Sequence, residues 1–401
     1  MSSFSSDDLC HPEVLIQENN PFVRTLTLNR PRQLNALSLE MLSRLSELFL
    51  ALEHDAKVKL VILKGNGKAF CAGGDAVVLA RHLYNGDWRF GTKTTEESYK
   101  LLYLIATYSK PQVSVLDGVC LGRGAAISIS CRFRIATENS IFSVPEVALG
   151  GFPDVGASYF LSRLPGFFGE YVALTGAQLD GPEMLACGLA THFVPSTKLA
   201  LLEEALASKV ASSTNNISSQ DLPFYISAII NDYSIRPAVN RKGSAIHKMD
   251  VIQKCFSKGS VEEILSALEK EAADKNLQDP INGDVWLSST IQSLQKASPT
   301  SLKLCLRSIR EGRCQGLGEC LAREYRMAYH AIRGKISSDF RNGCTSVFLK
   351  KDKIQKWEPC KLELITDQMV DQYFSKLGDD ENLEELKLLA KSNLLAIASK
   401  L

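Results

Sequence analysis

The chain has 401 residues, of which 45% are hydrophobic, so it can bury a large core and form about two or three domains. Its 46 Lys and Arg residues balance 45 Asp and Glu residues, which predicts no general attraction to nucleic acid or to an anionic membrane. The 11 cysteines contain no CxxC pair and are typical of a reducing compartment, and no apolar run reaches transmembrane length. Composition leaves the oligomeric state unknown.

The first predicted elements are a β-hairpin and a helix. Residues 14–18 and 23–28 are rich in β-formers and flank a turn at Asn19-Asn20-Pro21, which predicts two paired strands. Ser38 can cap a helix, and apolar residues then recur at the spacing of one helical face. The residues on this face are Met41, Leu42, Leu45, Leu48, Phe49 and Leu52, and His54-Asp55 mark the end of the helix.

Strand, glycine turn and helix then recur along the chain. Residues 60–63 predict a buried strand, followed by glycine turns at 65–67 and 71–75 that expose backbone N–H groups. A helix is expected over about 95–108, with strands over 112–116, 133–136 and 191–194 and a helix opening at Gly122-Arg-Gly124. This order predicts an α/β fold in which successive β-β-α units stack.

The second half of the chain is predicted to be mainly helical. Helix-period segments cover 261–273, 285–296, 298–310 and 318–332, with almost no strand signal. A polar run near residue 212 is the best linker in the chain. The expected organisation is a flexible N-terminus at 1–12, a core at 13–211, a linker at 212–221, a helical region at 222–390 and an exposed tail at 391–401.

Two carboxylates stand in an otherwise apolar segment over residues 143–158. Pro145 and Pro153 precede Glu146 and Asp154 directly, and glycines follow nearby, so both acids are expected on turns. A carboxyl group on a turn among apolar neighbours tends to have a raised pKa, which suits a general acid or base near neutral pH. Alternatively, Glu146 caps a helix and Asp154 closes an Asx-turn, and the segment alone leaves both interpretations open.

Several other chemistries lack the residues that they need. Cys71 has no histidine nearby in the sequence, and Gly156-Ala-Ser158 does not match the G-x-S-x-G serine motif. The 6 histidines form no ligand spacing, so no metal site is predicted. Gly122-Arg-Gly124 lacks the third glycine of a dinucleotide fingerprint, so no nicotinamide site is expected.

With these motifs in view, the chain resembles the 3-hydroxyisobutyryl-CoA hydrolases of the crotonase (enoyl-CoA hydratase/isomerase) superfamily. The resemblance is dense over residues 12–195 and patchier to about residue 360. It implies a crotonase-like spiral core, an acyl-CoA substrate and no cofactor, because CoA is part of the substrate. The motifs that carry it are Asn29-Arg-Pro31, Leu34–Leu37, Ala69–Asp75, Gly118–Gly124, Arg134–Glu138, Pro145-Glu146, Phe152–Gly156, Arg323–Arg326 and Asp339-Phe340.

The resemblance also implies roles for individual residues. Glu146 and Asp154 match the catalytic acids: Glu146 either attacks the thioester to form an anhydride or activates water, and Asp154 assists proton transfer and holds the substrate hydroxyl. The backbone N–H groups of Gly74 and of residue 123 match the oxyanion hole. Glu97 lies near the acidic substrate-contact position, although Ser98 or a solvated helix face is an equal alternative.

Arg123 departs from the family pattern, which has glycine at this position. If the turn needs a positive φ, the arginine costs about 1 kcal/mol or more, and its side chain can crowd the pocket or pair with Glu146 and lower its pKa. Ala126 stands where hydratases carry a second glutamate, which disfavours hydration chemistry. The first hypothesis is hydrolysis of a short 3-hydroxyacyl-CoA, foremost 3-hydroxyisobutyryl-CoA in valine catabolism. The alternative is an acyl-CoA-binding or regulatory protein whose hydrolysis Arg123 impairs.

Two further expectations concern CoA and location. Arg30, Arg32 and Lys68 lie in loops that meet CoA in the family, although each is also compatible with ordinary surface charge. The chain ends in Ser399-Lys-Leu401, which matches the address read by the peroxisomal import receptor. Asp7 and Asp8 are atypical of a mitochondrial transit peptide. The sequence therefore predicts a peroxisomal protein with the import receptor as a partner.

Overall fold

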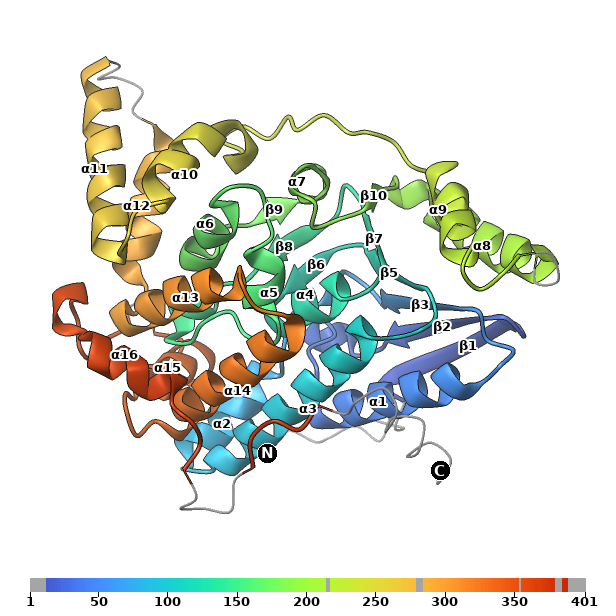
Figure 1. Ribbon diagram of the computed structural model, residues 1–401, viewed down its shortest axis with the longest axis horizontal. Coiled ribbons are helices and arrows are strands. Elements are labelled where there is room, and N and C mark those ends of the chain that lie inside the picture. The colour runs from blue at the N-terminus through green and yellow to red at the C-terminus, as the bar shows by residue number, and fades with distance from the viewer. Residues whose placement is uncertain (1–11, 214–216, 279–283, 353–354, 379–383, 389–401) are drawn as a thin grey trace, which may run out of the picture.

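The structure is a computed structural model that describes residues 12–213, 217–278, 284–352, 355–378 and 384–388. The predicted tail at 391–401 and nearly all of the predicted N-terminal segment at 1–12 lie outside these ranges. Two sheets lie next to each other, with helices on both sides (Figure 1).

The larger sheet has six strands in the order β1-β2-β3-β5-β7-β10. The predicted hairpin is confirmed, because β1 and β2 pair antiparallel, whereas the other neighbours pair in parallel. Every residue of β2 is buried, as expected for a strand covered on both faces. The strands are β1 (Val14–Asn20), β2 (Val23–Leu28), β3 (Leu60–Gly65), β5 (Gln112–Leu116), β7 (Phe133–Ala136) and β10 (His192–Phe193).

The smaller sheet has four strands and takes its members alternately with the larger one. Its order is β4-β6-β8-β9. The successive pairs β3-β4, β5-β6 and β7-β8 each place one strand in each sheet, so the chain advances along both sheets together. The predicted α/β fold with stacked β-β-α units is confirmed. The strands are β4 (Ala69–Cys71), β6 (Val119–Leu121), β8 (Ile141–Ser143) and β9 (Leu179–Asp180).

Helix α1 forms where the sequence predicts it. The Ser38 side chain accepts a hydrogen bond from the Met41 N–H at 3.0 Å, and all the apolar residues of the predicted face are buried. The helices of the first half are α1 (Leu39–His54), α2 (Ala76–Tyr84), α3 (Trp88–Ala106), α4 (Gly122–Ile129), α5 (Ala157–Leu161), α6 (Phe168–Thr175), α7 (Gly181–Cys187) and α8 (Leu199–Ser213).

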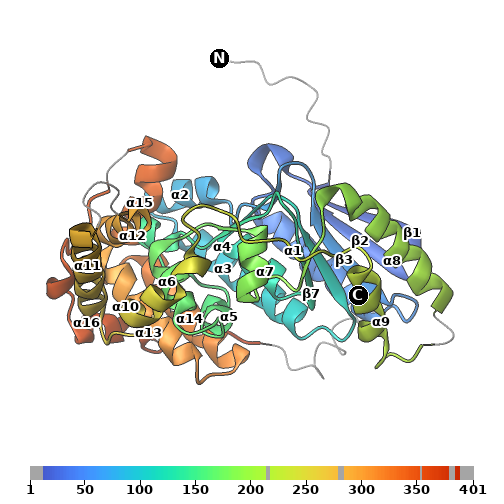
Figure 2. The same ribbon diagram turned by 90° about the horizontal axis from the view of Figure 1, so that it is seen from above.

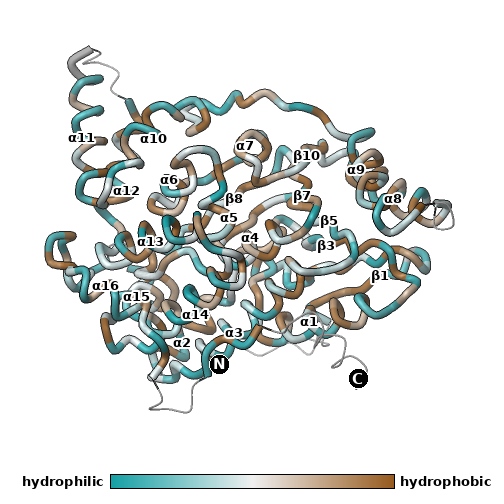
Figure 3. The backbone as a smooth tube through the Cα atoms, viewed as in Figure 1, coloured by the Kyte–Doolittle hydropathy of each residue, from teal (hydrophilic) through white to brown (hydrophobic). Residues whose placement is uncertain are grey.

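The rest of the described chain is mainly helical, as predicted. Helix α12 has the predicted bounds, and both colours appear along helices such as α11 and α14 in Figure 3, which is typical of helices with one buried face. No helix among the described residues is long and apolar enough to cross a membrane. The helices are α9 (Leu222–Asn231), α10 (Met249–Phe256), α11 (Val261–Gln278), α12 (Val285–Lys296), α13 (Pro299–Gly312), α14 (Leu317–Arg333), α15 (Asp339–Cys344) and α16 (Asp367–Phe374), with a π-helical segment at Thr345–Lys350.

Helices from the two sides of the predicted linker at 212–221 share one hydrophobic cluster. Leu202 and Leu206 of α8 and Ile226 and Ile229 of α9 pack with alternate residues of β3, β5 and β7. Helix α8 extends to Ser213, so the described part of this segment connects two helices that cover the same sheet. Helices α10 to α16 gather at the opposite end of the molecule (Figures 1 and 2).

Candidate active site

A cavity of about 600 Å³ lies where the glycine turns, the 143–158 segment and the C-terminal helices meet. Its wall is largely apolar and includes Phe90 of α3, Ile332 of α14 and Phe340 of α15. Gly74, Arg123, Glu146 and Asp154 all line this cavity, so the tertiary structure brings the predicted catalytic and oxyanion residues together. Such an apolar cavity with a few convergent polar groups is the expected form of a small-molecule site.

Glu146 begins a short 3-10 helix, Glu146–Leu149, which ends at Gly150 with φ of 73°. Its Oε2 atom is buried and has no hydrogen-bond partner among the described residues. A Cβ atom on Gly122 would stand 2.6 Å from Glu146 Oε1, so only glycine permits this carboxyl group to rest against the start of α4. Burial, followed by the charge of Asp154, raises the pKa of Glu146 to about 8, and Arg123 opposes this effect.

Asp154 lies opposite Glu146 and has two side-chain donors. Tyr99 Oη donates to Asp154 Oδ2 at 3.3 Å, and Arg123 Nη2 donates to the same oxygen at 3.4 Å. Burial raises the pKa of Asp154, whereas Arg123 and Tyr99 lower it. The two acids therefore both have the raised pKa expected from their turns among apolar neighbours.

The two glycine turns place backbone donors side by side. A Cβ atom on Gly73 would lie 3.3 Å from the Leu121 carbonyl oxygen and 3.8 Å from the Arg123 nitrogen. Within the described ranges, the Gly74 N–H has no hydrogen-bond partner. Arg123 lies in the first turn of α4, where N–H groups lack intrahelical acceptors. The backbone N–H groups of Gly74 and Arg123 can therefore donate hydrogen bonds to a negatively charged oxygen placed between the two turns.

Arg123 avoids the strain that the sequence raised as a concern. The positive φ of this turn, 48°, falls on Gly122, and Arg123 is not among the residues with positive φ. Its Nη2 atom donates to Thr95 Oγ1 at 2.8 Å and to Asp154, so the guanidinium group pairs with Asp154 instead of Glu146.

Helix α14 fixes the loop that follows Asp154. Glu324 Oε2 accepts a hydrogen bond from the Gly156 N–H at 2.5 Å, and its Oε1 accepts bonds from the Ser158 N–H at 2.8 Å and from Ser158 Oγ. The loop contains Val155 at a positive φ of 55°, which is uncommon for a β-branched residue. Burial raises the pKa of Glu324 to about 7. This carboxyl group holds the strained turn beside Asp154.

Helix α15 fixes the turn that follows Glu146. A Cβ atom on Gly150 would stand 2.5 Å from the Asp339 carbonyl carbon, and one on Gly151 would stand 3.1 Å from the Phe340 ring. Ser298 Oγ donates to Asp339 Oδ2 at 2.6 Å, which anchors the start of α15. The late motifs Arg323–Arg326 and Asp339-Phe340 thus pack on the segment that carries the two acids.

The remaining predicted site residues divide into two groups. Arg30 lines the cavity, where it pairs with Glu13 at 3.0 Å and with Asp75 at 2.9 Å. Glu97, Arg32 and Lys68 do not line it: the carboxylate of Glu97 faces Lys100, and the other two side chains are exposed.

The sequence analysis missed the roles of Thr95 and Tyr99, which bond Arg123 and Asp154, and of Glu324, which bonds the loop after Asp154. Thr95 and Tyr99 stand four positions apart on α3 and therefore share a helical face, a signal that was available in the sequence. Among the described residues, no cluster of His, Cys, Asp and Glu side chains is arranged to hold a metal ion.

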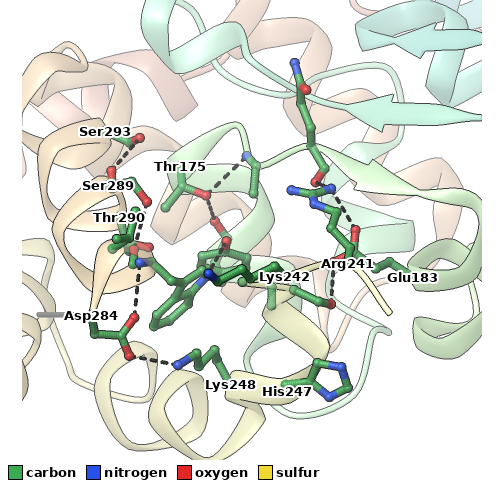
Figure 4. Close-up of a pocket in the computed structure, with 18 residues that line it drawn as sticks. Thr175, Glu183, Arg241, Lys242, His247, Lys248, Asp284, Ser289, Thr290 and Ser293 are labelled. Atoms are coloured by element: carbon green, nitrogen blue, oxygen red, sulfur yellow. Dashed lines mark hydrogen bonds and ion pairs between the residues drawn. The ribbon is translucent and has the colours of Figure 1, made fainter. Parts of the chain in front are cut away.

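A second cavity of about 1120 Å³ lies between α6, α12 and residues 241–248 (Figure 4). Arg241 Nη1 bonds Glu183 Oε2 at 2.9 Å, and Lys248 Nζ bonds Asp284 Oδ2 at 2.8 Å. Trp286 Nε1 donates to the Tyr171 hydroxyl at 3.0 Å. The acidic groups of this cavity are thus satisfied by neighbouring side chains.

Residues 23–374 match the family model described as enoyl-CoA hydratase/isomerase. The chain belongs to the enoyl-CoA hydratase/isomerase family. Within this family, "3-hydroxyisobutyryl-CoA hydrolase 1" of Arabidopsis thaliana is 55% identical over 385 residues, covering 96% of each protein. The human "3-hydroxyisobutyryl-CoA hydrolase, mitochondrial" is 36% identical over 372 residues, covering 92% of this chain and 90% of the human protein. The family resemblance seen in the sequence motifs is confirmed.

A solved structure of the same fold agrees with this assignment to the enoyl-CoA hydratase/isomerase family. The crystal structure of a carnitinyl-CoA dehydratase from Mycobacterium thermoresistibile is similar with a TM-score of 0.79 and 28% sequence identity. The similarity covers 94% of this chain and 99% of that chain, so it includes the C-terminal helices as well as the sheets.

The peroxisomal location predicted from residues 399–401 is contradicted by the relatives within the family. The human and chicken hydrolases are both named as mitochondrial proteins. Residues 399–401 lie outside the described residues, so the structure gives no support to an import receptor as a partner. Because these relatives are named as mitochondrial, the prediction of a peroxisomal location was wrong. A match of three residues carries less information than similarity over most of the chain.

Proposed function

We propose that this protein hydrolyses the thioester bond of a short 3-hydroxyacyl-CoA, namely 3-hydroxyisobutyryl-CoA, to 3-hydroxyisobutyrate and CoA. The observation that carries the proposal is the buried Glu146 Oε2, which lacks a partner in a cavity that also holds Asp154 and the Gly74 turn. The name of the Arabidopsis relative, at 55% identity, supports this substrate, which places the reaction in valine breakdown. The proposed reaction uses water and needs no cofactor.

The first step in this proposal is polarisation of the thioester carbonyl. Its oxygen accepts hydrogen bonds from the N–H groups of Gly74 and Arg123, which lie on adjacent turns. Donors that are already oriented stabilise the developing negative charge without reorganisation, and removal of one such donor typically costs about 100-fold to 1000-fold in rate.

Glu146 supplies the nucleophilic step, by one of two routes that the geometry leaves equivalent. In the first, its carboxylate attacks the carbonyl carbon, the C–S bond breaks, and water then hydrolyses the resulting anhydride. In the second, the carboxylate removes a proton from water as the water oxygen attacks. Both routes consume one water and release the acid and the CoA thiol, and Asp154 transfers the proton that the thiolate receives.

The residues at the start of α4 argue against the two rival functions. Ala126 is buried and supplies no second carboxyl group, which hydratase chemistry uses at this position. Arg123 is unstrained and binds Asp154, so it leaves Glu146 Oε2 without a partner and does not neutralise it. A protein that only binds acyl-CoA would gain nothing from a buried, unpartnered carboxylate oxygen.

Thiol release from 3-hydroxyisobutyryl-CoA tests the proposal directly. The wild-type protein is expected to release one CoA thiol for each 3-hydroxyisobutyrate formed, as followed by a thiol reagent and by chromatography of the acid. Glu146→Gln is expected to retain acyl-CoA binding, measured by calorimetry, and to lose the release. Tight binding by the wild type without thiol release would instead favour the binding-protein alternative.

A further inference from the structure

Arg123 adds a cation to a part of the cavity that the family pattern leaves to glycine. Its side chain is only 13% exposed and lines the cavity together with the two acids. Nη2 is held by Thr95 Oγ1 at 2.8 Å and by Asp154 Oδ2 at 3.4 Å, and Thr95 itself is buried. The guanidinium group is therefore fixed on the side that faces α3.

The other donors of this guanidinium group remain available. Among the described residues, Nε and Nη1 of Arg123 donate no hydrogen bond, and neither belongs to the buried polar atoms without a partner. A Cβ atom on Gly74 would lie 3.5 Å from Arg123 Cδ and 3.9 Å from Nη1. Nη1 thus stands beside the turn at which the proposed function places the thioester carbonyl.

Arg123 offers hydrogen-bond donors next to Asp154, whose carboxylate is an acceptor. Both side-chain bonds to Asp154 end on Oδ2, and no side-chain donor of the described residues bonds its Oδ1. A hydroxyl group donates one hydrogen bond and accepts others, so it can satisfy both residues at once. A carboxylate only accepts and would face the Asp154 charge, and an alkyl group would displace water from Arg123 without replacing its hydrogen bonds.

We propose that Arg123 is the specificity-determining residue of the acyl pocket: it donates a hydrogen bond to a hydroxyl group on the acyl chain, and its side chain limits the length of that chain. This inference rests on the proposed function for the reaction that follows binding. The choice of acyl group can be measured by binding alone, without that reaction. A site built around a substrate hydroxyl discriminates strongly against the analogue that lacks it, because its polar groups are then left unpaired.

The test compares ligands that differ only in the acyl group. CoA thioethers with a 3-hydroxyisobutyryl-like chain, with the same chain lacking the hydroxyl group, and with a six-carbon alkyl chain are not cleaved, so their Kd values report binding alone. They are measured by calorimetry with the full-length wild type, Arg123→Met, Arg123→Gly and Arg44→Met. Arg44 is exposed on α1 and serves as a matched control for the removal of an arginine.

The wild type and Arg44→Met are expected to prefer the hydroxylated chain by about 100-fold or more. Arg123→Met keeps the length of the side chain without its donors, and its preference is expected to fall below about tenfold. Arg123→Gly is expected to bind the six-carbon chain at least about tenfold more tightly than the wild type does. An unchanged preference in both Arg123 variants, with circular dichroism equal to that of the wild type, would overturn the inference.

The same ligands separate this inference from the proposed function. If the wild type prefers the hydroxylated thioether but releases no thiol from the corresponding thioester, the hydrolase proposal fails and the role of Arg123 stands. If the wild type hydrolyses hydroxylated and unsubstituted thioesters equally well, and Arg123→Met does the same, the role of Arg123 fails and the hydrolase proposal stands.

Discussion

The two cavities of this protein differ because only the smaller one contains a buried carboxyl oxygen without a partner among the described residues. In the larger one, about 1120 Å³, Glu183 bonds Arg241 and Asp284 bonds Lys248. In the smaller one, about 600 Å³, Glu146 Oε2 is buried without a partner. A buried acceptor without a hydrogen bond costs about 1–3 kcal/mol, so the smaller cavity retains an unfavourable feature that the larger one lacks.

This difference shows why volume alone does not identify a site. The larger cavity is lined by charged side chains whose hydrogen bonds serve the fold, including the Asp284 cap of α12. In the smaller cavity, Glu146 Oε2 has no partner among the described residues and faces the space that a ligand would fill. Destabilised groups of this kind tend to occur at functional sites, because the fold offsets their cost elsewhere.

Loss of the acids in the smaller cavity is expected to have the largest effect. Glu146→Gln should lower kcat for thiol release by about 1000-fold or more, because either route needs an ionised carboxylate. Asp154→Asn should lower it by about 100-fold or more, because proton transfer to the leaving thiolate is lost. Steady-state assays with 3-hydroxyisobutyryl-CoA measure both values. A rate unchanged in both variants would remove these acids from the mechanism.

The link between α14 and the loop after Asp154 should dominate the stability of the smaller cavity. Glu324→Ala removes the acceptor of three hydrogen bonds and leaves their donors buried, so the free energy of unfolding should fall by about 3 kcal/mol or more. Urea denaturation followed by fluorescence measures this change. Glu324→Gln keeps one acceptor and should lose less, and equal losses would argue against hydrogen bonding as the cause.

Glu146→Gln should stabilise the protein at alkaline pH while it abolishes catalysis. The folded protein keeps the Glu146 proton up to a pKa of about 8, whereas an unfolded chain releases it near 4.5. Because the folded state binds more protons between these values, this residue lowers the stability as the pH rises through that window. Glutamine does not titrate, so the variant should gain at least about 1 kcal/mol over the wild type between pH 5 and pH 8. Equal pH dependence in urea denaturation would contradict the burial of this carboxyl group.

The pH dependence of hydrolysis should report the same group. If Glu146 acts as a carboxylate, kcat/KM should rise about tenfold per pH unit as the pH increases toward about 8. Arg123 lowers the pKa of Glu146, so Arg123→Met should move this limb to higher pH. If the low-pH part of the kcat/KM profile is the same in Arg123→Met and in the wild type, the guanidinium charge does not act on Glu146.

Variants in the larger cavity should have the smallest effect on activity. Lys248→Met breaks the pair with Asp284, yet kcat/KM for 3-hydroxyisobutyryl-CoA should stay within about twofold of the wild type. The melting temperature, measured in parallel, should fall by a few degrees at most. A tenfold loss of activity with an unchanged melting temperature would contradict the distinction between the two cavities.

The sequence predicted those helices whose caps and apolar faces lie within one continuous segment of the chain. Helix α1 has its cap, its apolar face and its end within one segment, and α12 was predicted with its observed bounds. Helix α2 and the first turns of α3 were missed because they follow glycine turns, although Asp75 and Asp87 cap them. Capping by aspartate was therefore a local signal that the analysis did not use.

The sequence by itself indicated which residues carry the proposed chemistry, because Glu146, Asp154, Gly74 and Arg123 stand in short motifs that resemble those of the 3-hydroxyisobutyryl-CoA hydrolases. Tertiary structure alone decided how they are used. The direction of the Arg123 side chain depends on Thr95 and Asp154, which lie 28 and 31 positions away, and the loop after Asp154 is held by Glu324 of α14. Burial raises the pKa of both acids, as their turns among apolar neighbours predicted, but the helices that complete the cavity around them, such as α3 and α14, come from distant parts of the chain.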